Sequence, residues 1–281
     1  MSVSKVARRR GEILDEIMAY HRDRLPKVMR EVPLEDLRAF ATVSPPAADF
    51  YQALKTPGVA LIAECKKASP SRGLIAPHYD PQELAQTYIK AGARAISVLT
   101  DRRHFQGSLD DLRTVKEAAL DSAKKGKGIP ILRKDFIFHP YQVYEARVAG
   151  ADAILLITRV LSDSELGDLL GLAHRLGMQA LVEVHSEEEM VRALAAQSQI
   201  IGVNNRNLQT FEVDFANTAR LRDMVPAEIA LVGESGLKTE ADIQRMKEIG
   251  VDAVLVGETL MRSKDVYKTA RALVTAGQDQ G

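Results

Sequence analysis

Acidic and basic side chains stand at the ends of several short apolar segments of this 281-residue sequence. Glu64 and Lys66 end one such segment, Lys134 ends another and Glu183 ends a third. A carboxylate and an ammonium group in one cavity can give protons to a substrate and take them from it, which is the basis of general acid–base catalysis. These residue types therefore indicate proton-transfer chemistry, provided that the fold brings them together.

Strand periodicity predicts that these side chains share one cavity. In a β-strand, residues two apart face the same side, so Glu64 and Lys66 share one face while Cys65 takes the other. Any one of the charged residues could form a structural ion pair, but a set at one end of a fold is better explained by a substrate site. The spacing of an apolar and an ionisable residue recurs in Ile62 and Glu64, Leu132 and Lys134, and Leu181 and Glu183, and polar residues end further segments at Asn204, Arg206 and Glu234.

Two glycine-containing segments near the C-terminus predict a phosphate site. Gly233-Glu234-Ser235-Gly236 and Gly257-Glu258 each follow an apolar segment. Backbone N–H groups at the start of a helix bind phosphate, because they are unpaired and lie at the positive end of the helix dipole. Each segment alone is also compatible with a plain turn, since glycine is common in turns. As a pair they favour phosphate binding by Ser235, Gly236, Gly257 and Glu258.

Eight apolar segments of strand length are each followed by a helical pattern. Such a repeat predicts an α/β fold, a closed parallel (β/α)8 TIM barrel, with its active site at the C-terminal ends of the strands. An open doubly wound sheet is the alternative, but it usually has a G-x-G-x-x-G turn after its first strand, and none follows Glu64. The predicted strands lie at residues 59–65, 95–99, 129–133, 153–157, 179–184, 199–203, 229–233 and 252–256.

The first 58 residues precede this repeat and contain three helical patterns, at residues 6–24, 33–40 and 48–54. They are too few and too polar to bury a core of their own. We therefore predict one domain over residues 1–281, in which residues 1–58 form a helical cap over the barrel mouth.

Composition excludes several classes of function. Lys plus Arg and Asp plus Glu number 38 each, so the basic excess typical of nucleic-acid-binding proteins is absent. The longest apolar runs are far shorter than the roughly 18 residues of a membrane span. With Cys65 as its single cysteine, the chain has no internal disulfide. A cytoplasmic protein that binds neither nucleic acid nor membrane is expected.

The cysteine and the histidines have simple structural interpretations. Cys65 faces away from the predicted cavity and is expected to be a small buried apolar residue. His21 and His174 lie in helical patterns and are expected at the surface, and alternation gives His185 no clear inward role. No two histidines have the spacing of metal ligands, so no metal site is predicted.

The segment Ile62-Ala63-Glu64-Cys65-Lys66-Lys67-Ala68-Ser69-Pro70-Ser71 resembles the signature of indole-3-glycerol-phosphate synthases. The resemblance spans essentially the whole chain, and it is the combination of segments that is specific. It implies a carbon–carbon lyase of tryptophan biosynthesis that converts 1-(2-carboxyphenylamino)-1-deoxyribulose 5-phosphate to indole-3-glycerol phosphate, carbon dioxide and water without a cofactor. The other segments that carry it lie at residues 105–108, 130–137, 181–184, 202–208, 232–236 and 255–258.

The resemblance also implies a role for each candidate residue. Lys134 matches the family's general acid and Glu183 its general base. Lys66 matches a residue that contacts the substrate's anionic groups and can serve as a second acid, and Glu64 is expected to hold the lysines in place. Asn204 matches a further catalytic residue, and Ser69, Arg206 and Glu234 match substrate-binding residues. Phe105, Phe136 and Leu155 match apolar walls of the cavity. The phosphate-binding matches are Ser235, Gly236, Gly257 and Glu258.

One position departs from part of the family. Some members have Ser where this chain has Glu258, and a carboxylate next to a phosphate is unfavourable. We therefore expect the side chain of Glu258 to turn away from the phosphate, so that only its backbone N–H contributes.

Three other functions remain possible at this stage. A Schiff-base aldolase acting on a phosphosugar would use Lys134 or Lys66 as its nucleophile. An enzyme similar to phosphoribosylanthranilate isomerase would also bind a phosphate in a barrel, but it has no need of both lysines. A non-catalytic regulatory barrel would not be expected to retain every charged position. Whether the enzyme associates with other enzymes of tryptophan biosynthesis stays open.

Overall fold

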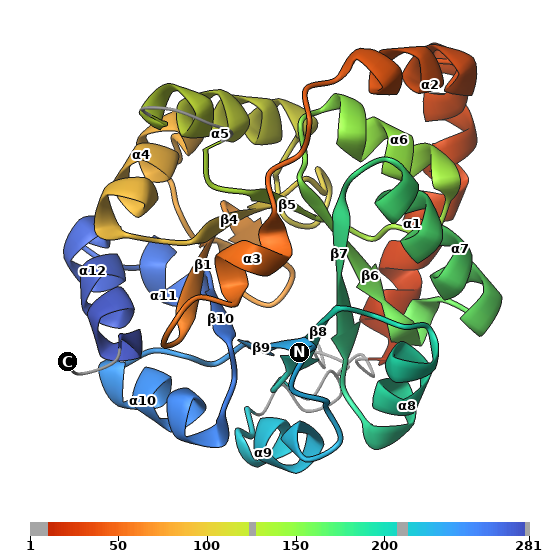
Figure 1. Cartoon of the computed structure of the whole chain (residues 1–281). Coiled ribbons are helices and arrows are strands. Elements are labelled where there is room, and N and C mark those ends of the chain that lie inside the picture. Colours follow the sequence, from red (N-terminus) through yellow and green to blue (C-terminus); the bar gives the residue numbers. More distant parts are fainter. Residues whose placement is uncertain (1–10, 124–127, 207–212, 279–281) are drawn as a thin grey trace, which may run out of the picture.

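Eight parallel strands close into a barrel in the computed structural model of the chain, which describes residues 11–123, 128–206 and 213–278 (Figure 1). Each strand pairs with the next one along the chain, and β1 closes the ring by pairing with both β4 and β10. The predicted barrel is confirmed. The strands are β1 (Ala60–Cys65), β4 (Ala95–Leu99), β5 (Ile131–Lys134), β6 (Ala153–Ile157), β7 (Gln179–Val184), β8 (Ile200–Asn204), β9 (Ala230–Glu234) and β10 (Ala253–Val256).

Helices surround the barrel, and their ends are marked in the sequence. The Asp80 side chain caps α4 by accepting the backbone N–H groups of Gln82 and Glu83, and Gly92 ends that helix with φ of 96°. The outer helices are α4 (Pro81–Ala91), α5 (Leu109–Ser122), α6 (Pro140–Val148), α7 (Asp163–Arg175), α8 (Glu187–Ala195), α9 (Ala216–Arg222), α10 (Glu240–Ile249) and α12 (Val266–Gly277), and the short α11 (Glu258–Met261) and 3-10 helix η1 (Thr158–Val160) lie at strand ends.

Strand alternation divides the core into two layers, as the sequence predicts. Ile62, Leu132 and Leu181 pack with one another inside the barrel. Cys65 belongs to the layer between the strands and the outer helices and has no exposed surface. Burial raises the pKa of the Cys65 thiol, and the neighbouring Glu64 and Asp111 charges raise it further. The prediction of a buried, unreactive cysteine is therefore consistent with its surroundings.

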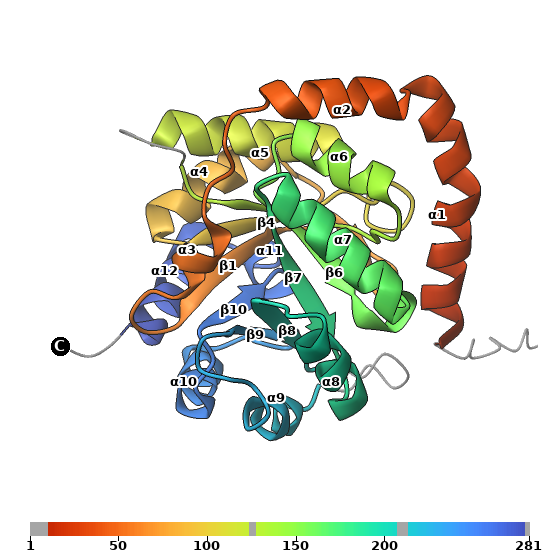
Figure 2. The same ribbon diagram turned by 45° about the vertical axis from the view of Figure 1, so that its right-hand side comes forward.

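Three helices precede the barrel: α1 (Gly11–Glu31), α2 (Leu34–Val43) and α3 (Phe50–Leu54). Figure 2 shows α2 beside α6, against which it packs, and α1 across the ends of α6 and α7. The predicted helix over residues 6–24 begins outside the described residues, and its predicted end was wrong. The helix continues through Pro26 to Glu31. A proline removes one N–H donor and crowds the carbonyl of the preceding turn, but contacts with the barrel, such as that of His21 with Asp101, stabilise α1.

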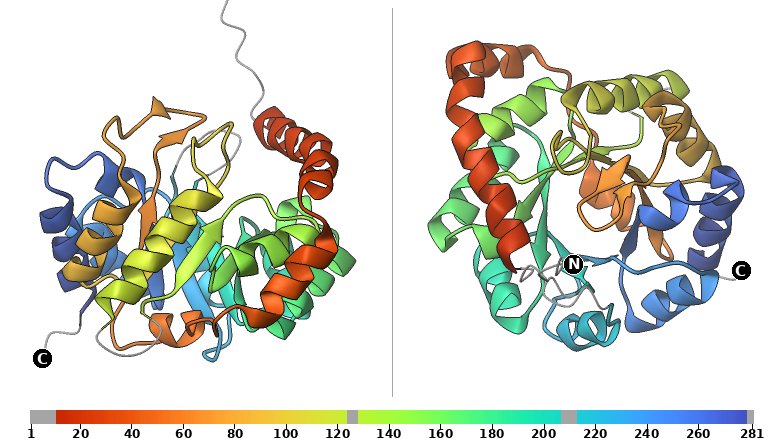
Figure 3. Two further views of the ribbon diagram at one scale, coloured as in Figure 1. Left: turned by 90° about the horizontal axis from the view of Figure 1, so that it is seen from above. Right: turned by 180° about the vertical axis from the view of Figure 1, so that it is seen from behind.

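The N-terminal segment does not lie entirely over the barrel mouth, which corrects that part of the prediction. α3 lies at the opposite end, where the backbone N–H groups of Phe50 and Tyr51 donate to the side chain of Gln179, the first residue of β7. Phe50 and Leu54 close the interior core from that end. Figure 3 shows α1 near one end of the barrel and α3 at the other. The apolar side chains of α3 are buried there rather than in the substrate cavity.

The loop after β1 forms a small hairpin at the mouth, from β2 (Ala68–Ser69) and β3 (Gly73–Leu74). Ala68 donates its backbone N–H to the carbonyl oxygen of Phe105 at 3.1 Å, which ties the hairpin to the loop after β4. The hairpin projects beyond the strand ends on the same side as α1 (Figure 3). Across residues 11–123, 128–206 and 213–278, no helix is long and apolar enough to cross a membrane.

Asp152, just before β6, joins the N-terminal segment to the barrel. Its buried carboxylate accepts the backbone N–H groups of Ala48 at 2.7 Å and Ile131 at 2.8 Å, and the ammonium of Lys116 lies 2.8 Å away. We expect Asp152→Ala to lower the free energy of unfolding by about 3–5 kcal/mol, because it leaves a partly buried cation and two buried N–H groups without partners. Urea denaturation followed by circular dichroism measures the loss.

The matched control is Asp110→Ala, which removes a largely exposed carboxylate paired with Arg113. That pair contributes about 1 kcal/mol or less. Equal losses in the two variants would contradict the role of Asp152 as a buried junction.

Candidate active site

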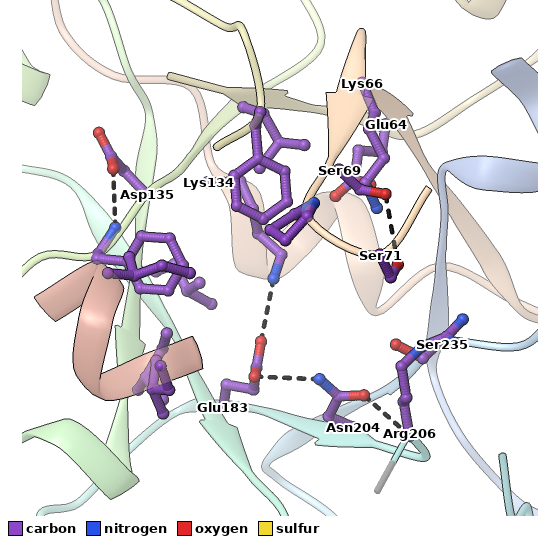
Figure 4. Close-up of a pocket in the computed structure, with 18 of the residues that line it drawn as sticks. Glu64, Lys66, Ser69, Ser71, Lys134, Asp135, Glu183, Asn204, Arg206 and Ser235 are labelled. Atoms are coloured by element: carbon purple, nitrogen blue, oxygen red, sulfur yellow. Dashed lines mark hydrogen bonds and ion pairs between the residues drawn. The ribbon is translucent and has the colours of Figure 1, made fainter. Parts of the chain in front are cut away.

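A cavity opens at the C-terminal ends of the barrel strands and extends under α1 (Figure 4). It has an apolar part and a polar part that meet at a set of charged residues. All fifteen candidate residues predicted from the sequence line one part or the other. The residues shared by both parts are Glu64, Lys66, Lys134, Asn204, Arg206, Ser235 and Glu258.

Lys134 and Glu183 form the centre of the cavity. The Lys134 ammonium lies 3.0 Å from one carboxylate oxygen of Glu183 (Figure 4). It also lies 3.4 Å from the carboxylate of Glu234. The other oxygen of Glu183 accepts a hydrogen bond of 3.2 Å from the side-chain amide of Asn204. Lys66 is paired separately, with Glu64 at 3.0 Å. Residues at the C-terminal ends of β5, β7, β8 and β9 thus converge on one point, as strand alternation predicts.

Burial and mutual charge together decide the protonation of this cluster. Burial alone would lower the pKa of the Lys134 ammonium, but the charges of Glu183, Glu234 and Glu64 outweigh it and raise the pKa. Burial would raise the pKa of Glu183, yet the charges of Lys134 and His185 hold it below its ordinary value. For Glu234 burial dominates, and with the neighbouring Glu183 and Glu64 charges it raises the pKa despite Lys134. The site therefore holds a cationic Lys134, an anionic Glu183 and a readily protonated Glu234.

Two glycines, Gly202 and Gly257, leave the space that the carboxylates of Glu234 and Glu64 occupy. A Cβ atom added to Gly202 in β8 would clash with the Glu234 carboxylate, and one added to Gly257 would clash with that of Glu64. Gly257 has φ of −121°, so its backbone conformation does not require glycine. The sequence indicated Gly257 as a phosphate-binding position, and the structure adds a steric reason for glycine there.

Apolar side chains form the other half of the cavity. The rings of Phe105 and Phe136 lie 6.2 Å apart, and Leu155 is buried beside them on β6. These walls were predicted. α1 completes the enclosure with three side chains spaced along one face, Ile13, Leu14 and Ile17. Their helical spacing in the sequence was a sufficient signal, although they were not singled out.

The polar half contains the glycine-containing turns. Ser235 and Gly236 adopt φ of 68° and 83°, a left-handed conformation in which glycine is favoured. A side chain at position 236 would also clash with Val213. Gly257 stands immediately before α11 and caps that short helix. The two turns, with Arg72, Lys238 and Arg262, line the polar half.

Glu258 lines both parts of the cavity, and the expectation that its side chain turns away from a bound phosphate stays a prediction. Its carboxylate lies 3.4 Å from the Arg72 side chain and 3.6 Å from that of Arg262. Both arginine side chains are more than half exposed at the rim of the polar half. The carboxylate therefore faces two cations, which stabilise it beside the predicted phosphate position.

Ser69 and Arg206 lie at the edges of the charged centre. Ser69 is on β2, with its hydroxyl 3.5 Å from that of Ser71. Arg206 follows β8, and its backbone N–H donates to the Asn204 side chain at 3.0 Å. The Asn204 amide is thus fixed between Glu183 and the Arg206 backbone, and Figure 4 shows this chain of contacts.

One histidine predicted at the surface, His21, lies in a buried cluster. His21 is buried, not at the surface, and its Nε2 lies 2.7 Å from the carboxylate of Asp101. His104 lies 3.2 Å from the same carboxylate, so Asp101 ties α1 to the loop after β4. The three residues place possible ligand atoms within 4.8 Å of one another, a proximity that sequence spacing could not show. Their mutual hydrogen bonds account for the cluster as a structural junction.

His185 was given no inward role, but it lies beside Glu183. Its Nε2 is 3.5 Å from a Glu183 carboxylate oxygen, and its Nδ1 is 3.2 Å from the carboxylate of Glu189. β7 ends at Val184, so strict strand alternation no longer describes the next residue. His174, in contrast, is exposed on α7, as predicted.

Comparison with solved structures shows the fold. The chain is similar to 3-hexulose-6-phosphate synthase, with a TM-score of 0.61, 16% identity and coverage of 78% of this chain and 99% of the other. It is also similar to thiamine phosphate pyrophosphorylase from Pyrococcus furiosus, with a TM-score of 0.60, 16% identity and coverage of 81% and 97%. At this identity the likeness establishes the barrel architecture alone.

Comparison of sequences is more specific. Indole-3-glycerol phosphate synthase from Dehalococcoides mccartyi is 49% identical over 266 residues, covering 93% of this chain and 100% of the relative. The enzyme of the same name from Acetivibrio thermocellus is 46% identical, covering 92% and 98%. The family model for indole-3-glycerol phosphate synthase matches residues 14–273. The chain belongs to the indole-3-glycerol phosphate synthase family.

Proposed function

We propose that this enzyme closes the indole ring of 1-(2-carboxyphenylamino)-1-deoxyribulose 5-phosphate and releases indole-3-glycerol phosphate, carbon dioxide and water. The observation that carries the proposal is the Lys134–Glu183 pair, which stands where the apolar and polar halves of the cavity meet. The apolar half suits the anthranilate ring. The glycine turns of the polar half suit the phosphate, and the reacting chain then lies across the charged pair.

The residues divide the proton transfers between them. Lys134 gives a proton to the ketone oxygen as the aromatic carbon that bears the carboxylate attacks the ketone carbon. A carbon–carbon bond forms, and carbon dioxide then leaves with the restoration of the aromatic ring. The resulting hydroxyl takes a proton from the Lys66 ammonium and departs as water, and Glu183 accepts the proton that the intermediate releases as the carbon–carbon double bond forms. Lys66 assists by binding the substrate's anionic groups, and Glu64 orients Lys66.

The protonation of Lys134 disfavours a Schiff-base aldolase. A Schiff-base lysine must lose its proton before it attacks a carbonyl group. The carboxylates around Lys134 raise its pKa, so this side chain remains a cation and serves as a proton donor. Borohydride treatment with substrate is therefore expected to leave the protein unlabelled.

A direct assay tests the function. The purified chain is mixed with the anthranilate-derived substrate, and indole absorbance and carbon dioxide release are followed together. Formation of both products in equal amounts supports the proposal. Consumption of substrate without carbon dioxide would indicate an isomerase or an aldolase instead.

The phosphate site makes a separate prediction. We expect Gly236→Val to weaken binding of the phosphorylated substrate by roughly 10- to 100-fold, because the branched side chain opposes the positive φ and clashes with Val213. Glu258→Ser is expected to leave affinity unchanged or to improve it by a few-fold, since it releases Arg72 and Arg262 for the phosphate. Calorimetry with phosphorylated ligands measures both effects.

A dephosphorylated ligand is the control for these variants. Both variants should bind it about as weakly as the unaltered enzyme does. A large loss of affinity in Glu258→Ser, with Gly236→Val unaffected, would place the phosphate nearer Lys66 and Ser69.

Wider features of the enzyme complete the proposal. We propose that residues 1–281 act as one domain, with α1 as the part of the N-terminal segment that covers the substrate. The reaction needs only the side chains of the cavity, without a metal or an organic cofactor. The lone cysteine is consistent with a cytoplasmic location. Association with other enzymes of tryptophan biosynthesis can be tested by co-purification.

A further inference from the structure

His185 lies between two carboxylates at the edge of the active site. Its Nδ1 is 3.2 Å from Glu189 and its Nε2 is 3.5 Å from Glu183. The side chain is only 11% exposed, and Nε2 is buried without a hydrogen-bond partner in the described structure. Because the mechanism above does not use this imidazole, its position next to the general base needs an explanation.

Glu189 is a firm anchor for the ring. Its carboxylate also accepts the backbone N–H of His185 at 2.7 Å and lies 3.2 Å from the Thr158 hydroxyl. Glu189 stands in the first turn of α8, where the helix dipole stabilises a negative charge. Thr158 also contacts the backbone carbonyl oxygen of Glu183 at 2.7 Å, so the anchor and the base belong to one network.

The orientation of the ring follows from this anchor. When Nδ1 donates its proton to Glu189, Nε2 faces Glu183 and its protonation state determines the charge beside the base. Burial lowers the pKa of the imidazole, but the bond to Glu189 and the charges of Glu183, Glu189 and Glu234 raise it above its ordinary value. On α9, the facing residue Asn217 donates its side-chain amide to the His185 carbonyl oxygen and brings no charge.

We propose that His185 is a positioning residue for Glu183: held by Glu189, it orients the carboxylate through the oxygen that Lys134 does not contact and stabilises it as an anion. This proposal rests on the assignment of Glu183 as the general base. Lys134 and Asn204 already contact Glu183, and His185 supplies a third contact that does not involve the substrate cavity. When Lys134 gives up its proton, the Glu183 carboxylate still has the His185 imidazole beside it and can turn toward the substrate.

Two substitutions separate the two ends of the ring. Asn can reproduce the Nδ1 contact with Glu189 but is too short to reach Glu183, whereas Gln reaches toward Glu183 with a neutral amide donor. We expect His185→Asn to lower kcat by roughly 10-fold with KM changed less than about 2-fold, and His185→Gln to lose less. His174→Gln, on the exposed surface of α7, should behave as the unaltered enzyme.

Measurements in the Glu183→Gln variant distinguish a positioning role of His185 from a purely structural one. In Glu183→Gln, adding His185→Asn should cause no further loss of the single-turnover rate, because the group on which His185 acts is already absent. The pKa of His185, followed by its imidazole resonance, should be lower in Glu183→Gln than in the unaltered protein, since the neighbouring negative charge is gone.

Three results would overturn the proposal. One is a greater loss in His185→Gln than in His185→Asn, which would mean that only the Glu189 contact matters. Another is an equal loss in both backgrounds, and the third is an unchanged His185 pKa in Glu183→Gln. The parallel assay of the unaltered enzyme keeps these outcomes apart from failure of the proposed reaction, which would show as no indole formation at all.

Discussion

Lys134→Ala is expected to fold normally and to lose turnover by about 10²- to 10⁴-fold, the usual effect of removing a positioned acid or base. The Lys134 ammonium contacts both Glu183 and Glu234, and Lys134 ends β5 at the centre of the cavity. Without it, no ammonium stands beside Glu183 to protonate the ketone oxygen. Steady-state and single-turnover rates of indole formation measure the loss.

Two further variants make the assignment sharper. Lys134→Arg keeps a positive charge, but a guanidinium does not release its proton, so it should recover binding and little of the rate. Lys90→Ala removes an exposed lysine on α4 that lies over Tyr267, and it should leave the rate unchanged. If Lys134→Ala kept near-normal turnover with the chemical step rate-limiting, the general acid would have to be Lys66.

The pH dependence of this acid has a definite sign. Because the neighbouring carboxylates raise the pKa of Lys134, its protonated form persists above the ordinary range of lysine. A fall in kcat/KM at moderately alkaline pH would therefore belong to another group. The charged centre contains three carboxylates, of Glu64, Glu183 and Glu234, against the ammonium groups of Lys66 and Lys134. The raised pKa of Glu234 relieves that imbalance.

Most of the charged centre could be predicted because it depends on local rules. Strand alternation places Lys134 and Glu183 inside the barrel, since each shares a face with an interior leucine. Parallel pairing then brings the ends of neighbouring strands together, as in the register of Asn204 with Glu234. Helix boundaries could be predicted for the same reason, because capping residues such as Asp80 and Gly92 stand directly beside the ends of the helix.

The errors arise where contacts join distant parts of the chain. His21 resembles a surface residue of an amphipathic helix, but it is buried because Asp101 lies 80 positions away in the sequence and 2.7 Å away in space. α3 has the same helical pattern as α1, and only the bond to Gln179 reveals the barrel end that it covers. The arginine pair beside Glu258 could not be predicted for the same reason, because Arg72 comes from the hairpin loop after β1.

Glu183→Gln is expected to slow a late step of the reaction far more than substrate binding. The amide keeps the shape of the carboxylate and can still contact Lys134 and Asn204, but it cannot accept a proton from the dehydrating intermediate. The loss of turnover should again reach about 10²- to 10⁴-fold. Rapid-quench analysis of a single turnover should reveal an intermediate that has lost carbon dioxide but not water.

The order of product release provides the decisive comparison for Glu183. In the Gln variant, carbon dioxide should appear faster than indole absorbance, whereas in Lys134→Ala both should be slow, because Lys134 acts before the carboxylate leaves. The matched control is Glu187→Gln, on an exposed carboxylate in the first turn of α8, which should leave both rates unchanged. If Glu183→Gln released carbon dioxide and indole together at unchanged single-turnover rates, the base would be Glu64 or Glu234. Of these, Glu234 is the stronger candidate, since it also contacts Lys134 and its raised pKa suits a group that exchanges protons near neutrality.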